Sequence, residues 1–240
     1  VVTKLNEAGA VSLGKLNMTE GAMGGYNPAL KVPENPWRES YWAGASSSGS
    51  GSATAAGLAF GTLGSDTGGS IRFPAAVCGT VGLKPTWGRV SRYGVMDLAE
   101  SLDHVGPLTR SAADAGIMLQ AISGSDPSDP TTLPHDVPDM LSEIGKGVKG
   151  LKIGWDEDYA TSGMEPSFAK AVEAGVKVME SLGAEIVEVK MPEIMREVYR
   201  MPHLIPTDTN SKDKHKVEKI KRLFSALTFA WRYQCDPGSV

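Results

Sequence analysis

A stretch dense in glycine and serine, GASSSGSGSATAAGLAFGTLGSDTGGSIRFPAA at residues 44–76, constrains the fold more than any other part of the chain. A flexible linker is the simplest alternative, because glycine and serine order poorly. The small residues at 50–60 argue against a linker, since alanine favours a helix and small side chains allow close packing. Glycine also permits positive φ and close backbone approach. We therefore expect an ordered, tightly packed backbone with a helix over residues 50–60.

The composition is that of a globular chain. It has 240 residues, of which 41% are hydrophobic and 22% charged, and a net charge of −4. This length suits one large domain or a domain and a half, and the mild charge favours neither a nucleic-acid partner nor a membrane surface. No apolar run approaches the ~18 residues of a membrane span, and the N-terminus lacks the order of a signal peptide. We expect a cytoplasmic protein.

Signals for metals and cofactors are missing from the sequence. Cys78 and Cys235 lie far apart without a CxxC pattern, and the four histidines form no cluster. Neither GxGxxG after a strand nor GxxxxGK[ST] occurs. We expect no metal and no cofactor, and we expect Cys78 to be a small buried residue.

The first half of the chain predicts short elements separated by loops. VVTKLNEAG is typical of a helix end closed by Gly9, and residues 10–16 alternate like a short strand. Residues 27–42 contain three prolines and predict an irregular loop. Further along, Ser111 followed by Asp114 at the third helical position predicts the start of a helix.

The clearest unit is a strand, helix and strand near the end. It comprises a strand at 151–155, a helix at 166–182 that opens with proline and is closed by Gly183, and a strand at 184–190. Such a run implies a right-handed crossover and parallel pairing within an α/β sheet. Residues 124–139, which contain four prolines, predict the surface connection before it. The apolar face of the helix consists of Phe168, Val172, Val176, Met179 and Leu182.

Four motifs follow one another along the chain: GKLNMTEGAMG (14–24), GASSSGSGSATAAG (44–57), LGSDTGGSIRFPAAVCGTVGLKPTWGRVSRYGV (63–95) and SLDHVGPLTRSAADAGIML (101–119). In order and spacing they resemble the amidase signature family. The resemblance implies an α/β fold with a mixed central sheet flanked by helices, here incomplete. It covers a core at 1–190 that starts inside a domain, whereas residues 191–240 form an atypical C-terminal segment. Family members hydrolyse or transfer carboxamides with a serine nucleophile, a second serine after a cis peptide bond, and a lysine.

The resemblance implies two catalytic serines. The nucleophile is the serine of DTGGS, Ser70, and the bridging serine is Ser46, which lies 24 positions earlier and is thereby chosen over Ser47 and Ser48. The alternatives are a structural serine in a tight turn for Ser70 and a helix-capping hydroxyl for Ser46. Bare glycine backbone can bring several N–H groups to within about 3 Å of a developing oxyanion. The implied oxyanion hole is Thr67, Gly68 and Gly69.

Two further groups of residues follow from the same resemblance. Asp66 and Arg72 flank the nucleophile and are expected to pair and support the loop. A segment lining the substrate channel is matched by Ala22, Met23 and Gly24, for which plain packing is the alternative. The preceding position, which relatives often fill with phenylalanine, is Gly21 here.

The catalytic lysine of the family belongs to a motif upstream of GKLNM, and only 14 residues precede Lys15. The base therefore lies outside the chain if the chain is a fragment, or this copy has lost it; the absence of a helix start before Val1 favours the fragment. Neither Lys15 nor Lys84 is assigned. The leading hypothesis is an amidohydrolase acting on a small-molecule amide. The alternatives are one subunit of a glutamine-dependent amidotransferase and a catalytically silent fragment, with a homodimer or partner subunits as the candidate assemblies.

Overall fold

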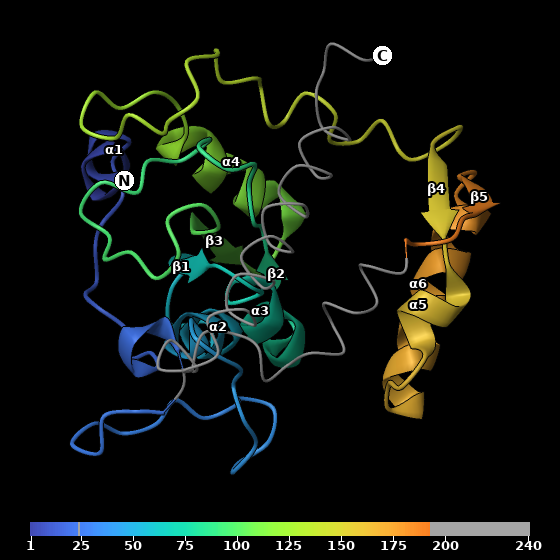
Figure 1. The fold of residues 1–240 in the computed structure, drawn as a ribbon, viewed down its shortest axis with the longest axis horizontal. Helices are drawn as coiled ribbons and strands as arrows, with labels where there is room; N and C mark the ends of the chain where they lie inside the picture. Colours follow the sequence, from blue (N-terminus) through green and yellow to red (C-terminus); the bar gives the residue numbers. More distant parts are fainter. Residues whose placement is uncertain (24, 193–240) are drawn as a thin grey trace, which may run out of the picture. The chain divides into compact units, whose positions relative to one another are not determined.

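The computed structural model describes residues 1–23 and 25–192 (Figure 1). The chain divides into two compact units, Val1–Ile144 and the part that begins at Gly145. The boundary expected at residue 190 stays a prediction, because the atypical segment lies outside the described residues from 193 onward.

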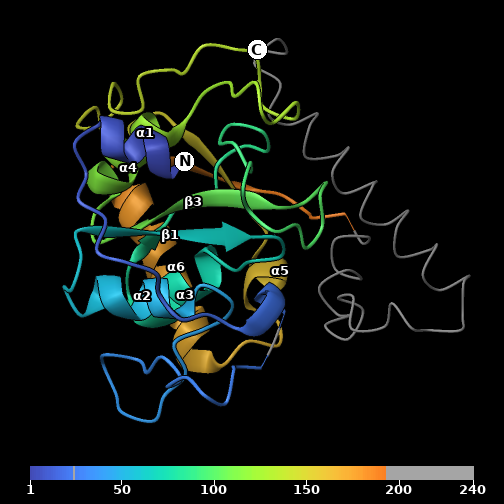
Figure 2. The ribbon, with the colours of Figure 1, turned by 90° about the vertical axis from the view of Figure 1, so that its left-hand side faces the viewer.

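The first unit is a three-layer arrangement around an antiparallel sheet with strand order β1-β3-β2. Two helices, α2 and α3, cover one face, and α1 and α4 cover the other (Figure 2). The register of β1 against β3 runs from Gly61 opposite Thr109 to Asp66 opposite His104. The elements are α1 (Val2–Glu7), α2 (Ser48–Ala55), β1 (Gly61–Asp66), α3 (Arg72–Cys78), β2 (Val81–Gly82), β3 (His104–Thr109) and α4 (Ala112–Ile122).

The hydroxyls of α2 explain why this buried helix is rich in serine and threonine. Ser50 Oγ donates to the Leu63 carbonyl oxygen of β1 at 2.7 Å. The hydroxyls of Thr54 and Thr62 form a hydrogen bond of 2.9 Å, and both residues are buried. Buried polar groups need such partners to offset desolvation. The serine-rich stretch is therefore a packed helix, and the linker alternative is wrong.

Glycines allow the neighbouring backbones to come close to α2. A Cβ on Gly64 of β1 would lie 2.6 Å from Ser47 Oγ and 2.8 Å from Leu108 Cδ1. A Cβ on Gly49 would lie against the Asn17 carbonyl oxygen, to which the Gly49 N–H donates at 3.1 Å. The density of glycine in this part of the sequence thus comes from steric crowding.

The hydrophobic core lies on both faces of β3. One cluster consists of Ile71, Ala75 and Leu108 and joins α3 to the sheet. The other joins α4 to the sheet and consists of Val90, Val105, Leu119 and Ile122.

Several predicted elements are confirmed in the first unit, and one is wrong. The initial helix ends before Gly9, which has a φ of +84°. Ser111 caps α4 by accepting from the Asp114 N–H at 3.1 Å. The strand expected at residues 10–16 does not form, because this exposed segment has no partner strand among the described residues. The buried Cys78 is also as expected, and burial raises the pKa of its thiol.

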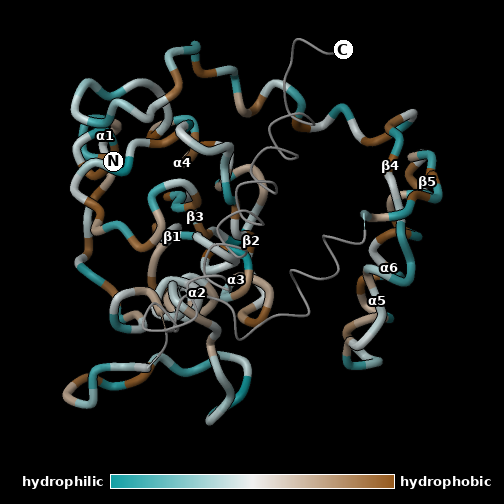
Figure 3. Tube along the Cα trace, in the orientation of Figure 1, coloured by the Kyte–Doolittle hydropathy of each residue, from teal (hydrophilic) through white to brown (hydrophobic). Residues whose placement is uncertain are grey.

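The second unit contains the predicted strand, helix and strand. β4 (Lys152–Trp155) pairs in parallel with β5 (Glu185–Glu188), and α6 (Pro166–Ser181) connects them. A short helix, α5 (Glu157–Thr161), was not predicted. The α6 helix alternates between hydrophobic and hydrophilic segments in Figure 3. Together the two units confirm the α/β class, with antiparallel pairs in the first and a parallel pair in the second.

Candidate active site

The turn at residues 67–71, called here the glycine turn, connects β1 to α3 and is organised by Asp66. The Asp66 carboxylate is fully buried and accepts from the backbone N–H of Gly69 at 2.8 Å and of Ile71 at 3.1 Å. Gly69 has a φ of +140°, a conformation that favours glycine. This geometry presents the half-buried Ser70 at the centre of the turn.

The Asp66 carboxylate also forms the expected pair with Arg72. Arg72 Nε lies 3.0 Å from Oδ2, and Nη2 lies 3.0 Å from Oδ1. Burial raises the pKa of Asp66, but the hydrogen bond and charge of Arg72 and the N–H groups of Ile71 and Arg72 together outweigh it. The pKa of Asp66 is therefore below its ordinary value, and the group remains a carboxylate.

The serine run lies beside the glycine turn. The Ser47 N–H donates to the Ser70 carbonyl oxygen at 3.3 Å, so two segments 23 positions apart in the sequence are in backbone contact. The peptide bond between Ala45 and Ser46 is cis, as the resemblance implies. The structure therefore brings Ser46 and Ser70, the two predicted catalytic serines, into the same region.

The three consecutive serines have different surroundings. Ser47 Oγ binds the backbone of Ser65, accepting from its N–H at 3.2 Å and donating to its carbonyl at 3.3 Å. Ser48 Oγ accepts a hydrogen bond from the Tyr26 hydroxyl at 2.8 Å. Ser46 is only 1% exposed, and its Oγ has no hydrogen-bond partner among the described residues. The structure thus separates Ser46 from its neighbours independently of sequence spacing.

The backbone N–H groups of the glycine turn differ in availability. The Gly69 N–H donates to Asp66 Oδ1. The N–H groups of Thr67, Gly68 and Ser70 have no acceptor within residues 1–23 and 25–192. Gly68 is exposed, and a Cβ there would meet no atom within 4 Å. Donors therefore remain available at the exposed side of the turn.

Three polar residues next to the glycine turn were not singled out from the sequence. Thr67 Oγ1 donates to Asp103 Oδ1 at 2.5 Å, and His104 Nδ1 lies 3.1 Å from the Asp66 carbonyl oxygen. The Lys84 ammonium lies 3.1 Å from His104 Nε2. Asp103 and His104 belong to the motif SLDHVGPLTR, which was the available signal.

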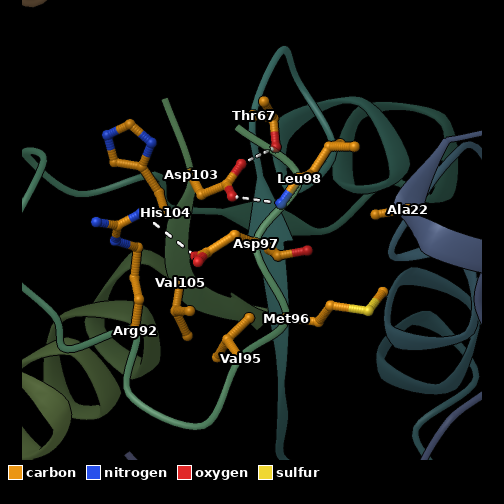
Figure 4. Close-up of a pocket in the computed structure, with 11 residues that line it drawn as sticks. Ala22, Thr67, Arg92, Val95, Met96, Asp97, Leu98, Asp103, His104 and Val105 are labelled. Atoms are coloured by element: carbon orange, nitrogen blue, oxygen red, sulfur yellow. Dashed lines mark hydrogen bonds and ion pairs between the residues drawn. The ribbon is translucent and has the colours of Figure 1, made fainter. Parts of the chain in front are cut away.

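Two cavities adjoin this region. The smaller, of about 20 Å³, is drawn in Figure 4 and is bordered by Thr67, Asp103 and His104. The larger, of about 300 Å³, lies around residues 17–22. Both are lined by Ala22, Ser65, Val95 and Met96.

The three residues predicted to line the substrate channel differ in their relation to the two cavities. Ala22 borders both cavities. Met23 is 42% exposed and lines neither of the two. Gly24 lies outside the described residues.

The described part of the chain also bears on metals and membranes. No group of three His, Cys, Asp or Glu side chains is placed there to hold a metal ion. None of the described helices has the length and apolar character needed to cross a bilayer.

The cis peptide bond before Ser46 and the backbone contact between the serine run and the glycine turn agree with the resemblance found in the sequence. The chain belongs to the Amidase family, whose sequence profile matches residues 1–234.

Individual relatives fall into two functional groups. AmiD of Mycobacterium tuberculosis (strain H37Rv), provisionally named an amidase, is 53% identical over 183 residues, which are 76% of this chain and 38% of AmiD. A glutamyl-tRNA(Gln) amidotransferase subunit of Akkermansia muciniphila is 54% identical over 190 residues, 78% of this chain and 40% of that protein. The chain thus spans about two fifths of the length of these relatives.

A solved structure gives the same assignment. The crystal structure of the corresponding glutamyl-tRNA(Gln) amidotransferase subunit from Thermotoga maritima matches with a TM-score of 0.80 at 40% sequence identity. The match covers 97% of this chain and 52% of that one.

Proposed function

We propose that the protein cleaves carboxamide C–N bonds through a serine acyl-enzyme, with Ser70 as the nucleophile. Ser70 Oγ attacks the carbonyl carbon, the amine or ammonia leaves with a proton, and water releases the acyl group as a carboxylic acid. The observation that carries this proposal is the buried Ser46 hydroxyl, which has no hydrogen-bond partner in the described part of the chain and precedes Ser47, whose N–H donates to the Ser70 carbonyl. Most buried hydroxyls in proteins have a partner, although those of Thr19 and Ser123 also lack one among the described residues.

Ser46 acts as the proton relay. A serine hydroxyl attacks poorly until a base removes its proton, and Ser46 Oγ passes the proton from Ser70 to a lysine. The resemblance assigns that lysine to a motif that precedes the GKLNM element in the family. Burial and neighbouring groups can lower the pKa of a lysine enough for it to act as a base. Lys84 is not assigned this role, since its ammonium donates to the Pro85 carbonyl at 2.8 Å and contacts His104.

The backbone of the glycine turn stabilises the tetrahedral intermediate. The N–H groups of Thr67 and Gly68 bind the developing oxyanion, together with that of Ser70. Each such donor contributes about 3 kcal/mol to transition-state stabilisation. Gly69 was also predicted to donate, but its N–H is held by Asp66, so we assign Gly69 to the shape of the turn.

The substrate is a small-molecule amide that reaches the turn past residues 22–24. The position of Ala22 between the two cavities supports this route. Asp66 and Arg72 support the turn and take no part in bond making. We propose that the protein acts in the cytoplasm without nucleic acid, as a homodimer or with partner subunits. The mild net charge supports the absence of a nucleic-acid partner.

A second candidate is one subunit of a glutamine-dependent amidotransferase, which the likeness to the two amidotransferase subunits favours. Such a protein would deliver ammonia from glutamine to a partner. Affinity purification of the tagged protein from its own host distinguishes the two. Stable co-purifying subunits and glutamine-dependent ammonia release support the amidotransferase, whereas turnover of simple amides by the isolated protein supports the amidase.

A fluorophosphonate probe tests the nucleophile in the complete protein. We expect one covalent adduct, located by mass spectrometry on Ser70 and lost in Ser70→Ala. Ser12→Ala, which removes an exposed serine, serves as the control and keeps full labelling. Labelling that persists in Ser70→Ala would falsify the assignment.

A further inference from the structure

Asp103 and His104 lie where β3 begins, opposite the end of β1. Asp103 is buried, and its Oδ1 accepts the Thr67 hydroxyl at 2.5 Å. Its Oδ2 accepts the backbone N–H of Leu98 at 2.8 Å (Figure 4). The same oxygen also accepts the backbone N–H of Ala99 at 2.9 Å. One carboxylate therefore ties the first residue of the glycine turn to the loop before β3.

The hydrogen bonds of His104 fix its tautomer. A carbonyl oxygen can only accept, so the contact between Nδ1 and the Asp66 carbonyl at 3.1 Å requires a proton on Nδ1. Nε2 then offers a lone pair to the Lys84 ammonium at 3.1 Å. Burial and the Lys84 charge lower the pKa of His104, and they outweigh the hydrogen bonds to the backbone of Asp66 and Leu102 and the Asp66 charge, which raise it. The imidazole is therefore neutral and bridges Lys84 to the backbone of Asp66.

This bridge acts on one particular peptide unit. The Asp66 carbonyl and the Thr67 N–H belong to the same planar amide, so fixing the direction of one fixes the other. A hydrogen bond to the carbonyl also polarises the amide and strengthens its N–H as a donor. His104 holds this amide through its carbonyl, and Asp103 holds the next residue through its side chain.

The geometry points to Asp103 and His104 as positioning residues that aim the N–H groups of Thr67 and Gly68 at the developing oxyanion. This inference rests on the proposed function of Ser70. Neither residue touches the reacting atoms. Their contribution is the orientation of donors, which affects the transition state more than substrate binding.

The test measures fluorophosphonate labelling of Ser70 in the complete protein as a function of probe concentration. We expect His104→Ala to lower the maximal labelling rate by roughly tenfold to a hundredfold, the range for small misplacements of catalytic groups. The half-saturating probe concentration stays unchanged. His104→Asn recovers most of the rate, because its amide nitrogen can still donate to the Asp66 carbonyl.

Two further variants complete the design. Asp103→Asn has only one acceptor oxygen for the Thr67 hydroxyl and the two backbone N–H groups, so its maximal rate falls. His135→Asn makes the same substitution at an exposed histidine outside this network and leaves the rate unchanged. Urea unfolding of each variant checks that the protein remains folded under the assay conditions.

The outcomes separate the two proposals. An unlabelled wild type, or labelling that survives Ser70→Ala, overturns the proposed function and this inference with it. If Ser70 is labelled but folded His104→Ala and Asp103→Asn both react at the wild-type rate, only the positioning role is wrong. Loss of rate in His104→Asn equal to that in His104→Ala also contradicts it.

Discussion

Arg72 makes two hydrogen bonds to the Asp66 carboxylate: Nε donates to Oδ2 and Nη2 donates to Oδ1, each over 3.0 Å. The two residues lie at either end of the glycine turn, and their pairing joins the two ends of the segment that contains Ser70. The same carboxylate binds the N–H groups of Gly69 and Ile71, so one buried charge orders the whole turn. Such a buried charge needs all of its partners, because an uncompensated ion is costly in the interior.

Removing the carboxylate should unfold much of this region. Asp66→Ala leaves the backbone N–H groups of Gly69 and Ile71 without their acceptor. Each unsatisfied buried donor costs about 1–3 kcal/mol, so we expect the free energy of unfolding to fall by roughly 2–5 kcal/mol, measured by urea denaturation. The control is Glu34→Ala, which removes a surface ion pair with Lys31 at 3.2 Å and should cost less than about 1 kcal/mol. Equal losses in the two variants would contradict the structural role of Asp66.

The Asp66–Arg72 pair also predicts a pH dependence. Because the pKa of Asp66 is lowered from 3.8, its stabilisation is fully present above that value and is lost as the pH falls through the lower folded value. Arg72→Met removes the group that contributes most to this lowering. We expect the stability difference between wild type and Arg72→Met to be largest near neutral pH and to shrink as the pH falls through the lowered pKa of Asp66, where the carboxylate becomes protonated. Urea titrations between neutral and acidic pH measure it, and a difference independent of pH would count against the pair.

The three consecutive serines should respond differently to alanine. Ser46→Ala removes a buried hydroxyl that has no partner among the described residues, so stability stays equal or rises while fluorophosphonate labelling is lost. Ser47→Ala removes two hydrogen bonds to Ser65 and costs about 1–2 kcal/mol. Thermal melting and labelling rates separate these effects. A fully reactive Ser46→Ala would remove the relay from the mechanism.

Two glycine substitutions should change the free energy of unfolding in opposite directions. Gly49→Ala places a Cβ against the Asn17 carbonyl, and we expect destabilisation by roughly 1–3 kcal/mol. Gly175 lies inside α6, where a new Cβ would meet no described atom within 4 Å and the backbone has no positive φ. Gly175→Ala should therefore stabilise by about 1 kcal/mol. Urea denaturation tests both, and destabilisation by Gly175→Ala would show that α6 has a neighbour at this position.

Local signals predicted elements whose stabilising contacts are close in sequence. The Ser111 cap and the proline and glycine that bracket 166–182 act within a few residues, so the helices α4 and α6 were found near their observed bounds. The strand expected at 10–16 failed because alternation cannot supply a hydrogen-bonding partner strand. The short helix α5 was missed, although the Asp156 side chain caps it by accepting from the Tyr159 N–H at 3.1 Å.

The candidate site shows the same division. The amino-acid sequence alone determined the family resemblance and, through the order and spacing of its motifs, which serines and glycines are predicted to form the site; their roles stay predictions. Only the tertiary structure decided that the Gly69 N–H belongs to Asp66, that Ser46 differs from Ser47 and Ser48 in lacking a partner among the described residues, and that Asp103 and His104 adjoin the turn. These relationships depend on hydrogen bonds and burial between segments tens of residues apart. Residue types and intervals carry no information about such bonds until the chain has folded.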